Sequence, residues 1–123
     1  MDNRIKITDL NRFKANKEPI SVLTAYDCFS AKLAQDAGVD LILVGDSLGT
    51  VIQGRHNTLS VTLDDMVYHS EIVSRVTEKP MIIADMPFMS YQVSPEEALT
   101  NAGSLIQDGG AQVVKLEGGR AVS

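Results

Sequence analysis

Residues 40–49 (DLILVGDSLG) limit the possible folds more than any other stretch of the chain. Four consecutive branched apolar residues end at a glycine, and a carboxylate and a hydroxyl follow at once. Such a run without polar alternation is typical of a strand buried on both faces, as in parallel α/β sheets. Asp46 then stands at the carboxyl end of the strand, followed by Ser47. In α/β barrels and doubly wound sheets, ligands and catalytic groups gather at that edge.

The same pattern occurs twice more. Residues 81–84 form an apolar run that ends at Asp85, and residues 112–116 form another that ends at Glu117 and contains Lys115. Because the carboxyl ends of parallel strands lie at one edge of a sheet, the pattern predicts three carboxylates and a lysine close together.

The rest of the sequence predicts an α/β chain that forms a single unit over residues 1–123. Residues 1–19 are expected to be a helical segment, with a helix over residues 8–15 capped by Thr8. Residues 20–123 are expected to carry four strands and three helices. The strands are predicted at 20–25, 41–44, 81–84 and 112–116, and the helices after caps at Asp27 or Ser30, at Thr62 and at Ser94.

Two further segments lie near the predicted site. Residues 46–61 are predicted to be a long glycine-containing loop that covers the site. The apolar residues 86–91 either wall a pocket or pack beneath it. The helix after Ser94 is expected to bury Ala98, Leu99, Ala102, Leu105 and Ile106.

Composition excludes several classes of function. The 123 residues are 44% hydrophobic, enough for one core, and the formal net charge of −5 argues against binding to nucleic acid or an anionic membrane. No signal peptide and no apolar run of about 18 residues is present, so a cytoplasmic protein is expected. The single cysteine, Cys28, excludes an internal disulfide.

The side chains at the strand ends indicate a hard cation. Asp46, Asp85 and Glu117 offer only oxygen, which suits magnesium better than zinc. Alternatively, these carboxylates cap helices or pair with Lys115, which is costly on an apolar strand unless it is paired or used. Ser47 either donates a hydrogen bond to a substrate carboxylate or caps a turn.

Five blocks of sequence together resemble the ketopantoate hydroxymethyltransferase family in order and spacing. They are residues 23–27 (LTAYD), 37–49 (AGVDLILVGDSLG), 61–69 (VTLDDMVYH), 84–91 (ADMPFMSY) and 109–119 (GGAQVVKLEGG). The resemblance implies a (βα)8 TIM barrel of the phosphoenolpyruvate/pyruvate superfamily that acts in pantothenate and coenzyme A biosynthesis. It also implies transfer of a one-carbon unit from 5,10-methylenetetrahydrofolate to 3-methyl-2-oxobutanoate, with Mg²⁺ as cofactor.

Carried over by position, the resemblance gives these residues roles. Asp46 and Asp85 become metal ligands with Glu117 as a third, and Asp46, Ser47, Asp85 and Lys115 become the substrate-binding set. A barrel of this type needs about 250 residues and eight strands, so the chain corresponds to an N-terminal half. The family's general base lies in the second half, so no catalytic base is assigned here.

Two alternatives stay open at this stage. A C–C lyase or mutase of the same superfamily would share the strand-end aspartates and the magnesium-held ketoacid. A half-barrel that assembles or binds without turnover would share only the fold. The expected partners are a small ketoacid, a folate and, because half a barrel leaves its sheet edges open, further copies of the chain.

Overall fold

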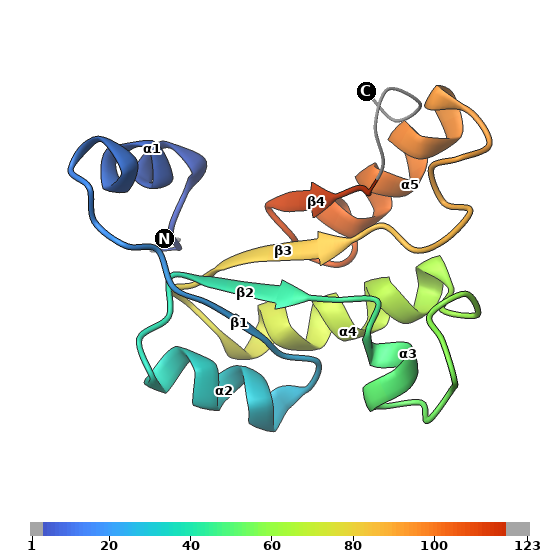
Figure 1. The fold of residues 1–123 in the computed structure, drawn as a ribbon, viewed down its shortest axis with the longest axis horizontal. Helices are drawn as coiled ribbons and strands as arrows, with labels where there is room; N and C mark the ends of the chain where they lie inside the picture. Colours follow the sequence, from blue (N-terminus) through green and yellow to red (C-terminus); the bar gives the residue numbers. More distant parts are fainter. Residues whose placement is uncertain (1–3, 118–123) are drawn as a thin grey trace.

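The computed structural model describes residues 4–117, which form a parallel four-stranded sheet with helices along one face (Figure 1). The strands are β1 (Val22–Thr24), β2 (Leu41–Val44), β3 (Met81–Asp85) and β4 (Val113–Lys115). The helices are α1 (Ile7–Ala15), α2 (Cys28–Asp36), α3 (Leu48–Val51), α4 (Leu63–Val76) and α5 (Pro95–Gln107).

The strands follow one another in space in the order β1-β2-β3-β4, and every neighbouring pair is parallel. A helix connects each strand to the next, as the sequence predicts. The order never reverses, as it would at the switch point of a doubly wound sheet. The arrangement is therefore that of consecutive βα units of a barrel.

The two faces of the sheet differ in what they pack against. Successive side chains of a strand point to opposite faces. Ile42 and Val44 of β2 and Ile82 and Ala84 of β3 form one cluster with the helices. Their helical partners in that cluster include Met66 and Val73 of α4 and Leu105 of α5, all fully buried. The other face carries Leu43 and Ile83, which are only partly buried, and leads to Asp85 and Lys115.

The predicted caps of α2, α4 and α5 are confirmed. Of the two candidates for α2, the Asp27 carboxylate is the cap. The Thr62 hydroxyl accepts a hydrogen bond from the Asp65 N–H at 3.0 Å. In turn, the Asp65 carboxylate accepts a hydrogen bond from the Thr62 N–H at 3.1 Å. Ser94 caps α5 by accepting from the Glu97 N–H at 3.1 Å. These local signals fix where the crossover helices begin.

The prediction for the first helix is wrong at its start. Helix α1 begins at Ile7 and not after Thr8, because the Asp9 carboxylate accepts a hydrogen bond from the Lys6 N–H at 2.9 Å and so moves the cap to Lys6. No residue of α1 is buried.

The prediction of one continuous loop over residues 46–61 is wrong in its first part. Residues 48–51 form α3, and Leu48 is fully buried. A Cβ at Gly49 would lie 2.6 Å from the Val61 Cγ2, so α3 packs directly against the end of the same segment. Hydrophobic packing of Leu48 therefore fixes the segment just after Asp46.

The burial prediction for α5 is confirmed for Leu105, while Ala98 and Ala102 are only partly buried and two other residues are exposed. Leu105 is fully buried, but Leu99 is 76% exposed and Ile106 is 48% exposed. The main contacts of α5 with other helices and strands of the described residues are with α4 and β4, and Leu99 and Ile106 lie outside that contact. Within residues 4–117, no helix is long and apolar enough to cross a membrane.

We expect the 123-residue polypeptide to self-associate when it is produced alone. Among the described residues, β1 and β4 each pair with one strand only, and Val22 and Leu23 of β1 are 49% and 48% exposed. Unpaired edges and exposed apolar side chains favour association. Size-exclusion chromatography with light scattering should therefore report dimers or larger species.

A charge on that edge should reduce the association. Val22→Lys places a lysine on β1, where it opposes edge pairing, and should shift the distribution toward the monomer. The matched control, His56→Lys, adds the same charge at an exposed position outside the sheet. A monomeric wild-type chain would contradict this interpretation of the open edges.

Candidate functional site

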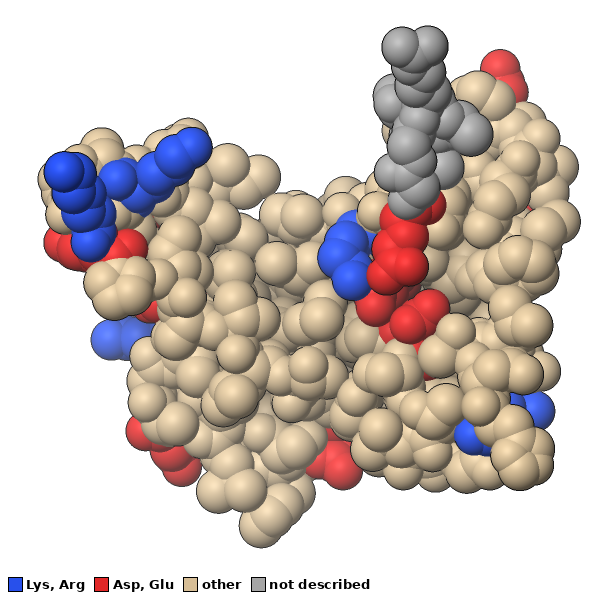
Figure 2. Space-filling view, viewed as in Figure 1, with Lys and Arg blue, Asp and Glu red and all other residues tan. Residues whose placement is uncertain are grey.

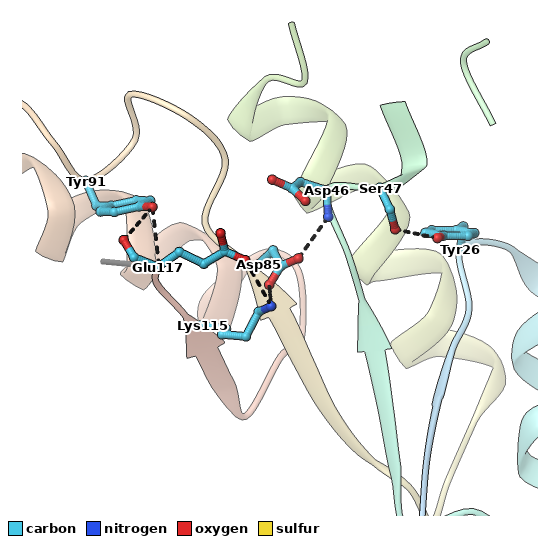
Figure 3. A network of polar contacts seen from close by, with 7 residues as sticks. All are labelled: Tyr26, Asp46, Ser47, Asp85, Tyr91, Lys115 and Glu117. Atoms are coloured by element: carbon cyan, nitrogen blue, oxygen red, sulfur yellow. Dashed lines mark hydrogen bonds and ion pairs between the residues drawn. The ribbon is translucent and has the colours of Figure 1, made fainter. Parts of the chain in front are cut away.

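The carboxyl ends of β2, β3 and β4 bring the predicted polar residues to one edge of the sheet (Figure 3). Asp85 is the last residue of β3, and it lies directly opposite Lys115, the last residue of β4. Asp46 follows β2, whose Val44 pairs with Ala84. The register of the sheet therefore places these three side chains side by side.

Asp85 connects the two neighbouring strands. Its Oδ1 lies 3.1 Å from the Lys115 Nζ, and its Oδ2 accepts a hydrogen bond from the Asp46 N–H at 3.0 Å. Asp85 is only 7% exposed. The lysine also lies 3.6 Å from Glu117 Oε1. Pairing with Lys115, one of the two interpretations of the sequence, is thus observed for Asp85 and Glu117.

A cavity of about 200 Å³ opens over these residues. Its lining residues come from the ends of β2, β3 and β4 and from the loops beside them: Asp46, Thr58, Leu59, Asp85, Met86, Phe88, Tyr91, Gln92, Lys115 and Glu117. In Figure 2, acidic side chains gather on this side of the sheet with a basic side chain beside them. The cavity is therefore a mixed-charge pocket with an acidic excess.

Electrostatics within the pocket oppose the ionisation of Asp46. Loss of solvent contact raises the pKa of the Asp46 carboxyl, and the charges of Asp85 and Glu117 raise it further, while Lys115 opposes them. The hydrogen bond to Asp85, with the charges of Asp85 and Glu117, raises the pKa of Lys115. The lysine is thus held in its charged form, and an added cation would favour the ionised form of Asp46.

Ser47 lies on the other side of Asp46, toward β1. Its Oγ is 2.6 Å from the Tyr26 hydroxyl (Figure 3), and Ser47 is not among the residues that line the cavity. A Cβ at Gly45 would lie 3.0 Å from the Ser47 Oγ and 3.4 Å from Asp85 Oδ2. A side chain at position 45 would therefore press on the serine hydroxyl and approach the buried aspartate.

The sequence analysis did not identify Tyr26 as a site residue. One signal could have done so, because Tyr26 follows β1 as Asp46 follows β2 and must lie at the same edge. His69 of α4 contacts the Tyr26 carbonyl oxygen through Nδ1 at 2.6 Å. A carbonyl can only accept, so Nδ1 carries the proton of this hydrogen bond.

Both interpretations of residues 86–91 apply to different parts of the segment. Met86 and Pro87 are buried, and the cavity is lined by Met86 and by Phe88, which is 49% exposed. The Tyr91 hydroxyl donates to the Glu117 carbonyl oxygen at 3.0 Å, which holds the segment after β4 against this loop. The loop therefore forms one wall of the pocket.

The donor set suits magnesium with two carboxylates better than with three. Among residues 4–117, no three His, Cys, Asp or Glu side chains are close enough together to hold a metal ion, and the Glu117 side chain is 81% exposed. Asp85 Oδ1 is buried and, apart from its ion pair, accepts no hydrogen bond from the described residues. Mg²⁺ commonly takes one or two carboxylates and completes its shell with water and substrate oxygens. Asp46 and Asp85 fit that requirement. That Asp46, Asp85 and Glu117 bind a metal ion together stays a prediction.

Two solved enzyme structures illustrate the similarity of this chain in fold. The phosphoenolpyruvate phosphomutase from Streptomyces platensis subsp. rosaceus superposes with a TM-score of 0.72 at 14% identity over 89% of this chain and 37% of that chain. A 2,3-dimethylmalate lyase, a PEP mutase/isocitrate lyase superfamily member, superposes with a TM-score of 0.69 at 23% identity over 94% of this chain and 40% of that chain. At these identities the similarities show the fold alone: the parallel α/β arrangement of this chain matches a part of each of those proteins.

Sequence comparison is more specific. Residues 4–123 match the family model described as ketopantoate hydroxymethyltransferase. The 3-methyl-2-oxobutanoate hydroxymethyltransferase of Pelobacter propionicus is 51% identical over 123 residues, which are 100% of this chain and 46% of that protein. The enzyme of the same name from Nitrosococcus oceani is 56% identical over 117 residues, which are 95% of this chain and 44% of that protein. The chain spans a little under half the length of these relatives, and it belongs to the ketopantoate hydroxymethyltransferase family.

Proposed function

We propose that the complete protein bearing this chain transfers a one-carbon unit from 5,10-methylenetetrahydrofolate to 3-methyl-2-oxobutanoate to give ketopantoate. The observation that carries the proposal is the convergence of Asp46, Asp85 and Lys115 on one cavity of about 200 Å³. The family match supports the substrates, since curated relatives 51% identical to the chain carry the name of this reaction.

The residues of the pocket suit an α-ketoacid. Lys115 supplies a positive charge next to the buried Asp85, and Ser47 supplies a hydroxyl at the adjacent strand end. Asp46 and Asp85 would hold a magnesium ion in this proposal. A magnesium ion bound there would draw electron density from the ketoacid oxygens and so favour loss of the proton on the neighbouring carbon.

In this proposal, the half of the barrel formed by this chain contributes charged groups that stabilise the reacting substrate. Lys115, held charged by Asp85 and Glu117, would stabilise negative charge that develops on the substrate oxygens. Phe88 and Tyr91 line the cavity and would limit the access of water. No residue of this chain is assigned as the general base, which we place in the remainder of the barrel.

Other properties belong to the same proposal. We place the protein in the cytoplasm as a homo-oligomer, with the ketoacid and the folate as its small-molecule partners.

The lyase or mutase alternative rested on features common to the superfamily, and the family match over residues 4–123 favours the transferase. Ketopantoate formation by the complete protein tests the proposal, and a protein that binds ketoacid without turnover would support the non-catalytic alternative.

Asp85→Asn in the complete protein should weaken the binding of magnesium and of 3-methyl-2-oxobutanoate together. The change removes the charge that Asp85 presents to Lys115 and to the proposed metal. Losing a charge-assisted contact typically costs enough free energy to weaken binding about tenfold or more. Isothermal titration calorimetry with each ligand measures both affinities.

Asp36→Asn is the matched control, because Asp36 is an exposed carboxylate at the end of α2. It should leave both affinities unchanged. Asp85→Asn with wild-type affinity for magnesium and ketoacid would overturn the assignment of this pocket.

Asp46→Asn should raise the melting temperature of the metal-free protein at pH 7. The raised pKa of Asp46 means that the folded state binds this proton more tightly than the unfolded chain does. Stability is therefore lost as the pH rises from the usual aspartate value through the raised pKa. Differential scanning fluorimetry should show the gap between variant and wild type closing at acidic pH, where the carboxyl is protonated in both states.

Asp27→Asn provides a control of opposite sign. Hydrogen bonds from the Ser30 backbone and side chain lower the pKa of Asp27, so its charge stabilises the folded state above the usual aspartate pKa. The Asp27 variant should melt below the wild type at pH 7, and the gap should fade as the pH falls through the lowered pKa. An Asp46→Asn variant that also melts lower at pH 7 would contradict the electrostatic account.

A further inference from the structure

Tyr26 is held at the edge of the site by three separate contacts of its segment. The neighbouring Ala25 N–H donates to the Leu43 carbonyl oxygen at 3.1 Å, which extends the β1–β2 ladder to this point. The Tyr26 N–H donates to the Ser30 Oγ at 3.2 Å, and His69 donates to the Tyr26 carbonyl oxygen at 2.6 Å. The backbone of Tyr26 is therefore fixed by β2, α2 and α4 together.

Among residues 4–117, the polar contact of the Tyr26 side chain is the 2.6 Å hydrogen bond with the Ser47 Oγ. Two hydroxyl groups carry two protons, and their mutual hydrogen bond uses one of them. One O–H thus stays available for a further acceptor. A phenol is a stronger donor than an aliphatic alcohol, so the favoured arrangement has Tyr26 donating and the Ser47 proton available.

Gly45 lies beside this pair. A Cβ there would be 3.0 Å from Ser47 Oγ and 3.4 Å from Asp85 Oδ2, so the absence of a side chain at position 45 leaves the serine hydroxyl in place. A ligand carboxylate that reaches the Ser47 hydroxyl can accept its proton. Two hydrogen bonds would then follow one another, from Tyr26 to Ser47 and from Ser47 to the ligand carboxylate. They would strengthen each other, because each hydrogen bond polarises the next.

We propose that Tyr26 is a positioning residue for substrate recognition: its phenol donates to Ser47 and holds the serine hydroxyl so that it donates to the carboxylate of the ketoacid. The inference rests on the proposed function, since it names the group of that substrate which Ser47 recognises. Tyr26 itself touches the serine and not the reacting atoms. His69 supports the same arrangement by fixing the tyrosine backbone.

Tyr26→Phe in the complete protein is the test, because it removes one hydroxyl and keeps the ring. Calorimetry in saturating magnesium should show binding of 3-methyl-2-oxobutanoate weakened about three- to tenfold, as expected for the loss of one hydrogen bond. Magnesium affinity without ketoacid should be unchanged. Tyr68→Phe removes the hydroxyl of a tyrosine on α4 that is 62% exposed, and this control should bind the ketoacid like the wild type.

A double-mutant cycle separates positioning from a structural role. In a Ser47→Ala background, Tyr26→Phe should have no further effect on ketoacid affinity, because the phenol acts only through the serine. An effect of equal size in both backgrounds would overturn the inference, as would a Tyr26→Phe single variant with wild-type affinity. Wild-type protein that fails to bind the ketoacid would overturn the proposed function and this inference with it.

Discussion

The pairing of β3 with β4 in parallel register is the constraint on which the site depends. It places Asp85 opposite Lys115, and the aspartate uses its second oxygen to accept the Asp46 N–H from the end of β2. One buried carboxylate thus joins three strand ends. The cavity and the charge balance of Asp46 and Lys115 all follow from that geometry. A slip of one residue between the strands would turn Lys115 to the opposite face of the sheet and separate the pair.

The strand ends and helix starts could be predicted because they depend on local rules. Apolar runs that end at Asp46, Asp85 and Glu117 identify buried parallel strands, and parallel strands share one carboxyl edge. Side-chain caps such as Thr62 and Ser94 lie within three residues of the groups that they satisfy. Both kinds of signal are complete within a short stretch of sequence.

The rest depends on contacts between segments that are distant in sequence. Helix α3 depends on the burial of Leu48 against other segments of the chain. A stretch of four residues is too short to show the periodicity of a helix in the sequence. Leu99 has the spacing of a buried position on α5, yet exposure depends on which elements lie beside the helix. Tyr26 and Ser47 are 21 positions apart, and no periodic pattern links two hydroxyls across neighbouring strands.

Gly45 has a consequence beyond the geometry of its own turn. The atom nearest to an added methyl group would be the Ser47 Oγ at 3.0 Å, the movable end of a short side chain, and not the sheet or the helices. An alanine at position 45 would therefore press first on the serine hydroxyl, which would have to shift by a few tenths of an ångström. Position 45 thus controls the shape offered to a ligand while the hydrophobic core stays intact, so variation there should alter selectivity for ligands before it alters folding.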